Sequence, residues 1–115
     1  MALANQDRKD LFPGALEMMI LHVLRGEPLH GYALVQRIKR TSHNLLQVEE
    51  GSLYPALQRM LKAGLLKAHW EVSESGRRVR TYELTAAGAK RLQREVSSFE
   101  RMLEGIKLVL APVEP

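Results

Sequence analysis

Five polar side chains between residues 49 and 63 have the chemistry to contact a polyanion. Hydroxyl, amide, guanidinium and ammonium groups donate hydrogen bonds to phosphate oxygens and to the edges of bases. The five residues are Ser52, Tyr54, Gln58, Arg59 and Lys62. Such a set favours a nucleic-acid contact, provided that one structural element presents all five on the same side.

The apolar residues of the same segment supply that element. They recur at the i, i+4, i+7 and i+8 spacing of one buried helix face, as Leu53, Leu57, Met60 and Leu61. Ser52 is a suitable N-cap, and Pro55 would then fall in the first turn, where its missing amide costs little. The pattern predicts an amphipathic helix over residues 52–63 that ends near Gly64 and keeps its polar face outward.

After Gly64 the period of the pattern falls from about 3.6 to about 2. This change predicts a strand at 66–72, a turn at 73–76 and a return strand at 77–84. The return arm carries three arginines suited to neutralising phosphates, namely Arg77, Arg78 and Arg80. The segment is therefore expected to form a two-stranded basic hairpin beside the amphipathic helix.

Three residues of the helix and the hairpin can have a structural role instead of contacting nucleic acid. Tyr54 can be a half-buried core aromatic with a satisfied hydroxyl. Trp70 alternates with apolar neighbours along its strand, which favours the core or an interface. Arg80 can pack its stem inward, and basic hairpins are often only solvated surfaces.

Two further helices are expected upstream. Residues 15–24 are almost wholly apolar, so that helix should be buried in the core or against a partner chain. Leu16 and Ile20 are its expected contacts in a dimer interface. A helix from about residue 30 or 31 to Arg40 should carry Tyr32 and Gln36 beside the amphipathic helix.

The order of three helices and a hairpin predicts a winged helix-turn-helix over residues 13–84. With one further helix after the hairpin, the fold is expected to be mainly α-helical. The polar residues 1–12 are expected to be a flexible N-terminal segment.

The last helix should run over residues 86–110 after Thr85 as its cap. Its apolar residues repeat at heptad spacing, as Leu92, Val96, Phe99, Leu103, Ile106 and Leu110. A helix of this length spans about 37 Å, and a body of three helices and a hairpin is too small to cover it. The seam therefore predicts a homodimer, although the helix can instead fold back on its own chain. Residues 111–115 should form a short tail.

Composition narrows the class of protein. The chain has 115 residues, of which 45% are hydrophobic, so it can bury the core of one domain. It has no cysteine, and its four histidines lack the spacing of a metal site. No membrane span, signal peptide or motif of an enzyme active site is present. We therefore expect a cytoplasmic, non-enzymatic protein without a cofactor or metal and without a membrane partner.

Four motifs resemble the PadR transcriptional regulators. They are PGALE (13–17), LHGYAL (29–34), EGSLYPAL (50–57) and GRRVRTYELTAAG (76–88). The resemblance covers residues 11 to about 105 and implies a repressor that dimerises through its last helix. It implies that the Leu-Tyr-Pro helix reads an operator and that the wing arginines hold the DNA backbone. A single terminal helix is similar to the short subfamily.

The same resemblance implies a ligand site, because some short members bind planar compounds between subunits near an aromatic of the last helix. Phe99 is close to that position, where a tryptophan would fit the pattern better. We consider Phe99 and Trp70 as ligand contacts.

The sequence thus predicts a dimeric regulator, a repressor, that binds a palindromic double-stranded operator, with a small planar molecule as its candidate effector. The alternatives are a winged-helix module that docks a protein without binding DNA, and a small-molecule carrier built on the dimer seam.

Overall fold

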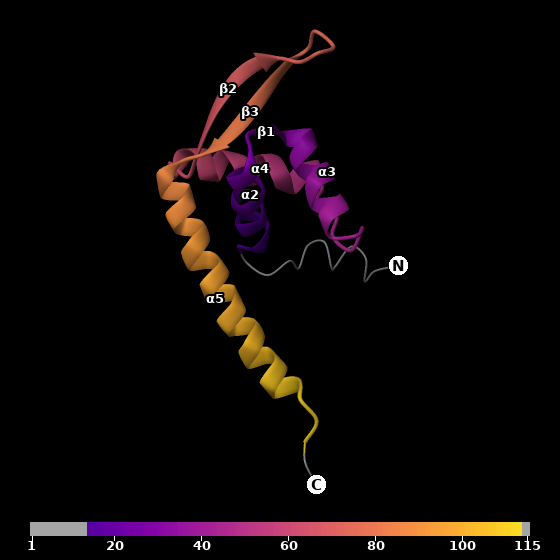
Figure 1. The fold of residues 1–115 in the computed structure, drawn as a ribbon, viewed down its shortest axis with the longest axis vertical. Coiled ribbons are helices and arrows are strands. Elements are labelled where there is room, and N and C mark those ends of the chain that lie inside the picture. Colours follow the sequence, from indigo (N-terminus) through magenta and orange to yellow (C-terminus); the bar gives the residue numbers. More distant parts are fainter. Residues whose placement is uncertain (1–13, 114–115) are drawn as a thin grey trace.

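The chain forms a body of three helices, a hairpin that projects from it and one long helix that leaves it at an angle (Figure 1). This computed structural model describes residues 14–113. The elements along the chain are α2 (Ala15–Gly26), β1 (Leu29–His30), α3 (Gly31–Thr41), α4 (Glu50–Lys62), β2 (Leu66–Val72), β3 (Arg78–Leu84) and α5 (Ala86–Leu110). The predicted flexible segment 1–12 lies outside the described residues.

The core lies where α2, α3 and α4 meet. Its fully buried large side chains are Ile20, Leu21, Leu34, Leu53, Leu57 and Met60. Burying one such side chain contributes about 1.5–3 kcal/mol of transfer free energy, so these helices hold the body together through their apolar faces. The predicted helix–helix–helix–hairpin–helix order is confirmed.

Helix α4 begins two residues earlier than the sequence pattern predicts. Its N-cap is Glu49, and the amide of Ser52 already donates to the Glu49 carbonyl at 3.0 Å. Ser52 is therefore inside the helix, and its prediction as N-cap is wrong. Pro55 consequently lies in the helix interior. Its ring lacks the amide that would donate to the carbonyl of Gly51, an exposed residue whose carbonyl can be satisfied by water.

The wing is a three-stranded antiparallel sheet in the order β1-β3-β2 and not the predicted two-stranded hairpin. The short strand β1 pairs Leu29 with Tyr82 and His30 with Thr81. Two residues are too few to show an alternating pattern, so the sequence gives no sign of this strand. It joins the base of the wing to the start of α3, because the His30 ring accepts a hydrogen bond from the Ala33 amide and caps that helix.

Thr85 fixes the direction of α5. Its hydroxyl accepts a hydrogen bond from the Gly88 amide at 3.0 Å, as expected of an N-cap, and donates one to the Gly64 carbonyl at 2.7 Å. Its amide donates to the Leu65 carbonyl. The predicted cap and the predicted bounds of α5 are confirmed. One threonine thus joins the end of α4, the start of β2 and the start of α5.

Candidate nucleic-acid interface

Helix α4 exposes all five predicted polar residues, but they do not share one direction. At about 100° per residue, Gln58 and Lys62 lie opposite the buried face of Leu53 and Leu57. Tyr54 and Arg59, five positions apart, lie about 140° from each other on opposite flanks. Gln58 and Lys62 are therefore the side chains that α4 presents outward, whereas Tyr54 and Arg59 border the surface.

Tyr54 is partly packed, because its ring covers the start of α3. A Cβ atom built on Gly31 would lie 2.8 Å from the Tyr54 hydroxyl oxygen, a distance that only glycine avoids. The Tyr54 side chain nevertheless remains 44% exposed. It combines both alternatives from the sequence, since its ring braces α3 and its outer edge stays accessible. Gly31 is a supporting residue that the sequence pattern did not single out.

Arg59 is held by an ion pair that local sequence could not reveal. Its Nε and Nη2 atoms donate to Glu17 Oε1 at 3.2 and 3.0 Å. Glu17 lies in the first turn of α2, 42 positions away in the chain. Arg59 therefore binds the body of the protein in this structure, and an external anion would have to compete with Glu17 for it.

Helix α3 carries the other two predicted contacts, Tyr32 and Gln36. Both are exposed, and they share one helix face because they are four positions apart. Tyr32 directly follows Gly31, on which the Tyr54 ring rests. The start of α3, which carries Tyr32, therefore lies against Tyr54 of α4.

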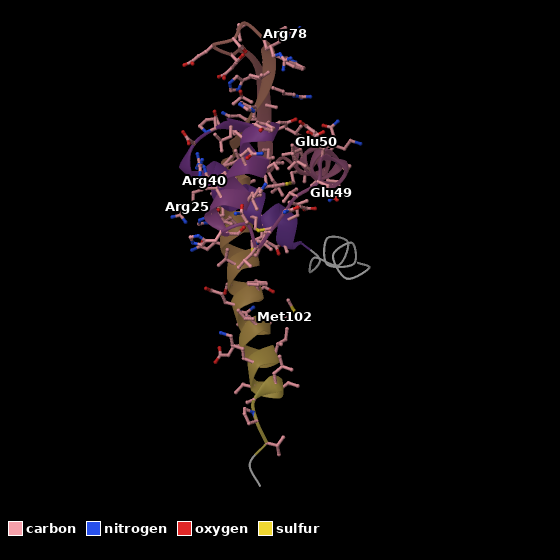
Figure 2. All side chains as sticks on the ribbon, turned by 90° about the vertical axis from the view of Figure 1, so that its right-hand side faces the viewer. Arg25, Arg40, Glu49, Glu50, Arg78 and Met102 are labelled. Carbon is pink, nitrogen blue, oxygen red and sulfur yellow. The ribbon has the colours of Figure 1, made fainter. Side chains whose placement is uncertain are left out.

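The wing carries all three predicted arginines on its surface. Arg77, Arg78 and Arg80 are exposed, and none of them forms an ion pair within residues 14–113. Figure 2 shows Arg78 at the far end of the wing, well separated from the body. The wing is thus a projecting arm with uncompensated positive charge.

A row of polar side chains fixes the opposite face of the sheet. His69 Nε2 lies 2.9 Å from Glu71 Oε1, and the Thr81 hydroxyl donates to Glu71 Oε2 at 3.0 Å. The hydrogen bond from His69, and after it the one from Thr81, holds the pKa of Glu71 below its ordinary value. Lys67 pairs with Glu83 on the same face. The carboxylates of the sheet are therefore engaged on the side away from Arg78 and Arg80.

Trp70 is exposed, which excludes the core and leaves an interface from the two predicted locations. Strand β2 runs outward, and the residues on its inner face become steadily more exposed, from Leu66 at 3% to Trp70 at 57% and Val72 at 71%. The wing extends beyond the helical body (Figure 1), so no apolar layer remains to cover its outer half.

The predicted partner contacts fall into two groups. Ile20 is 0% exposed and Leu92 is 4% exposed within one chain. Both belong to its own core, and their prediction as interface residues is wrong, because the first turns of α5 pack against α2. Leu16, Val96, Phe99 and Ile106 are only partly buried, and Leu103 and Leu110 are exposed.

The distal half of α5 extends away from the body, and Figure 2 labels Met102 on this stretch. Exposed apolar side chains continue to its end at Met102, Leu103, Val109 and Leu110, which lie in or beside the heptad seam, whereas the exposed Leu108 lies on the opposite side of the helix. The chain therefore leaves a long apolar helical surface uncovered.

The two proposed ligand contacts are not neighbours in the chain's fold. Phe99 lies halfway along α5 and lines an apolar cavity of about 410 Å³ with residues of α2 and α3. Trp70 belongs to β2, on the wing, which Figure 1 places on the other side of the body. A single site containing both residues of one chain is ruled out by this arrangement.

Two general findings complete the description of residues 14–113. No cluster of histidine and carboxylate side chains in this range could hold a metal ion. None of its helices combines the length and the apolar character needed to cross a membrane.

Three core helices followed by a wing define a winged helix-turn-helix protein. Residues 20–94 match the Transcriptional regulator PadR-like family, so the chain belongs to that family. It is 33% identical over 88 residues to the transcriptional regulator Rv3488 of Mycobacterium tuberculosis, covering 76% of this chain and 78% of the relative.

Solved structures share the fold. A transcriptional regulator from Clostridium thermocellum aligns with a TM-score of 0.81 at 24% identity, covering 89% of this chain and 99% of that one. Bacillus subtilis PadR, solved in complex with operator DNA, aligns with a TM-score of 0.64 at 22% identity, covering 71% of this chain and 46% of that one.

Proposed function

We propose that this PadR-like regulator is a homodimeric, cytoplasmic repressor without enzymatic activity. It binds a palindromic operator with α4 in the major groove and the wing on the DNA backbone. The observation that carries the proposal is the projecting wing with three arginines that form no ion pair in the described part of the chain, beside a helix that exposes Gln58 and Lys62. The Bacillus subtilis neighbour bound to operator DNA supports the same use of the fold.

In this proposal the contacts divide by role. Gln58 and Lys62 reach base edges or adjacent phosphates from α4, and Ser52, Tyr54 and Arg59 border the groove. Tyr32 and Gln36 approach from α3. Arg77, Arg78 and Arg80 neutralise phosphates and supply affinity and salt dependence more than sequence preference.

The uncovered face of α5 carries the proposal of a dimer. Its exposed apolar side chains would leave water if two copies paired, and a two-fold pair of α4 helices would suit a palindrome. A planar apolar ligand at Phe99 would relieve repression only if it bound more tightly to a dimer whose two DNA-binding domains are wrongly spaced for DNA than to the dimer that binds DNA.

Arg78→Ala tests the wing. Because each phosphate contact releases counterions, this change should weaken binding to every sequence and reduce the slope of log affinity against log salt by about one unit. The measurement is a titration at several salt concentrations with a duplex from the region upstream of the protein's own gene, after footprinting has located the site.

The matched control is Arg25→Ala, which removes the same charge from another part of the surface (Figure 2). It should leave the slope unchanged. An Arg78→Ala slope equal to that of the wild type would refute the wing role. Wild-type binding with no steep salt dependence and no preference for a palindrome would instead favour the protein-docking alternative.

Glu17→Gln tests whether Arg59 reaches DNA. Removing the carboxylate charge frees Arg59 from its ion pair, and exposed pairs contribute up to about 1 kcal/mol. Operator affinity should therefore rise by up to about fivefold. Glu27→Gln is the control, because it frees Arg37 from a similar ion pair, in which Arg37 Nη2 lies 2.8 Å from Glu27 Oε1. This pair is in the same part of the surface as Arg25. Equal operator affinities for both variants and the wild type would show that Arg59 does not contact the DNA.

A further inference from the structure

The exposed indole of Trp70 lies close to two arginine side chains of the neighbouring strand of the wing. The Arg78 guanidinium carbon is 4.7 Å from the centre of the Trp70 ring, and that of Arg80 is 5.9 Å away. The strand register places Trp70 directly opposite Arg80, with Arg78 opposite the next residue on the same face, Val72. Arg80 also lies 6.0 Å from the Tyr82 ring. One face of the wing is thus a ladder of aromatic rings and guanidinium groups.

Burial does not explain a tryptophan at this position. The Trp70 side chain is 57% exposed and packs beneath no helix. The contacts observed at its ring are the two cations, at distances where a guanidinium group is attracted to an aromatic face. Within residues 14–113 the carboxylates of the sheet, Glu71 and Glu83, are bound by His69, Thr81 and Lys67 on the other face. Arg78 and Arg80 therefore lie over an aromatic ring, and neither forms an ion pair within residues 14–113.

Stacking leaves the arginines free to bind an anion. A guanidinium group uses its flat face against a ring, while its five N–H donors point outward in the plane and can hold a phosphate in a bidentate manner. An unrestrained arginine loses much rotamer freedom when it binds, and a stacked one has already lost part of it.

We propose that Trp70 is a positioning residue that preorganises Arg78 and Arg80 for two neighbouring phosphates of the DNA backbone. This inference rests on the proposed DNA-binding function. Trp70 need not touch the DNA. It raises affinity by restraining the two cations, and the number of phosphates neutralised does not depend on it.

Trp70→Leu is the test, because leucine keeps an apolar side chain and removes the aromatic ring. Affinity for the operator duplex should fall by about fivefold, whereas the salt slope should stay at the wild-type value because both arginines remain. Trp70→Phe retains a ring and should recover part of the loss. In contrast, Arg78→Ala should change the slope itself.

A double-mutant cycle makes the coupling specific. In a background of Arg78→Ala with Arg80→Ala, Trp70→Leu should have no further effect on affinity, because the indole has no cation to position. Trp70→Leu costing the same fivefold in that background, or costing nothing in the wild-type background, would overturn the proposal.

The same ladder has a readout without DNA. Trp70 is the only tryptophan of the chain, so its fluorescence reports this contact alone. Arg78→Ala with Arg80→Ala should increase quenching by acrylamide, since the guanidinium groups no longer cover the ring. Unchanged quenching would overturn the stacking. Absence of salt-dependent DNA binding by the wild type would instead refute the proposed function and leave the fluorescence result standing.

Discussion

Gly88→Ala is expected to lower the free energy of unfolding by about 3 kcal/mol. A Cβ atom at this position would lie 2.2 Å from the Leu65 carbonyl oxygen and 2.6 Å from Leu84 Cδ1. The carbonyl belongs to the backbone and already accepts the Thr85 amide. It cannot move aside without breaking that hydrogen bond, so α5 must shift away from the base of the wing.

Gly105→Ala is the matched control in the same helix. Nothing lies within 4 Å of a Cβ atom added there, and alanine is favoured over glycine in a helix by about 1 kcal/mol. This change should therefore stabilise the protein slightly. The measurement is denaturant unfolding followed by circular dichroism at one fixed protein concentration. If both variants were equally stable, close packing at the junction of α4, β2 and α5 would not limit stability.

Ile106→Glu is expected to convert the proposed dimer into a monomer and to weaken operator binding by about 100-fold or more. The change places a charge in the apolar seam of α5, where pairing would bury it without a partner. Loss of the dimer also removes the high effective concentration of the second DNA-binding domain. In linked systems this effect raises the overall affinity by about two to four orders of magnitude. Sedimentation velocity gives the oligomeric state, and the operator titration gives the affinity.

Leu108→Glu provides the comparison, since it makes the same chemical change two residues further along. Leu108 is 73% exposed and lies about 200° around the helix from Ile106, outside the seam. It should leave the dimer and its DNA affinity intact. A wild-type protein that sediments as a monomer, or an Ile106→Glu dimer, would exclude pairing through this seam.

The structure reduces the region of the molecule in which an effector could bind. Trp70 and Phe99 were both candidates, and the fold assigns them to different elements on different sides of the body. Phe99 remains beside an apolar cavity, whereas Trp70 is accounted for by the two arginines. A search for an effector should therefore probe the region between α2, α3 and the middle of α5.

The sequence alone determined the elements whose signals are local. The apolar spacing and the threonine cap predict the helix over 86–110, and the alternating pattern predicts the basic hairpin. Such features depend on residues three or four positions apart, or on a single cap, so that a short window contains all the information. The order of these elements was also enough to predict a winged helix-turn-helix.

Only the tertiary structure decided how the candidate side chains are used. The Glu17–Arg59 pair joins residues 42 positions apart, the ring of Tyr54 rests on Gly31, and Ile20 and Leu92 are buried by the packing of α5 on α2. Trp70 has the same alternating pattern as a core residue, yet it is exposed because the wing projects past the helices. Periodicity records which face a side chain occupies, and only the packing of distant elements determines whether anything covers that face.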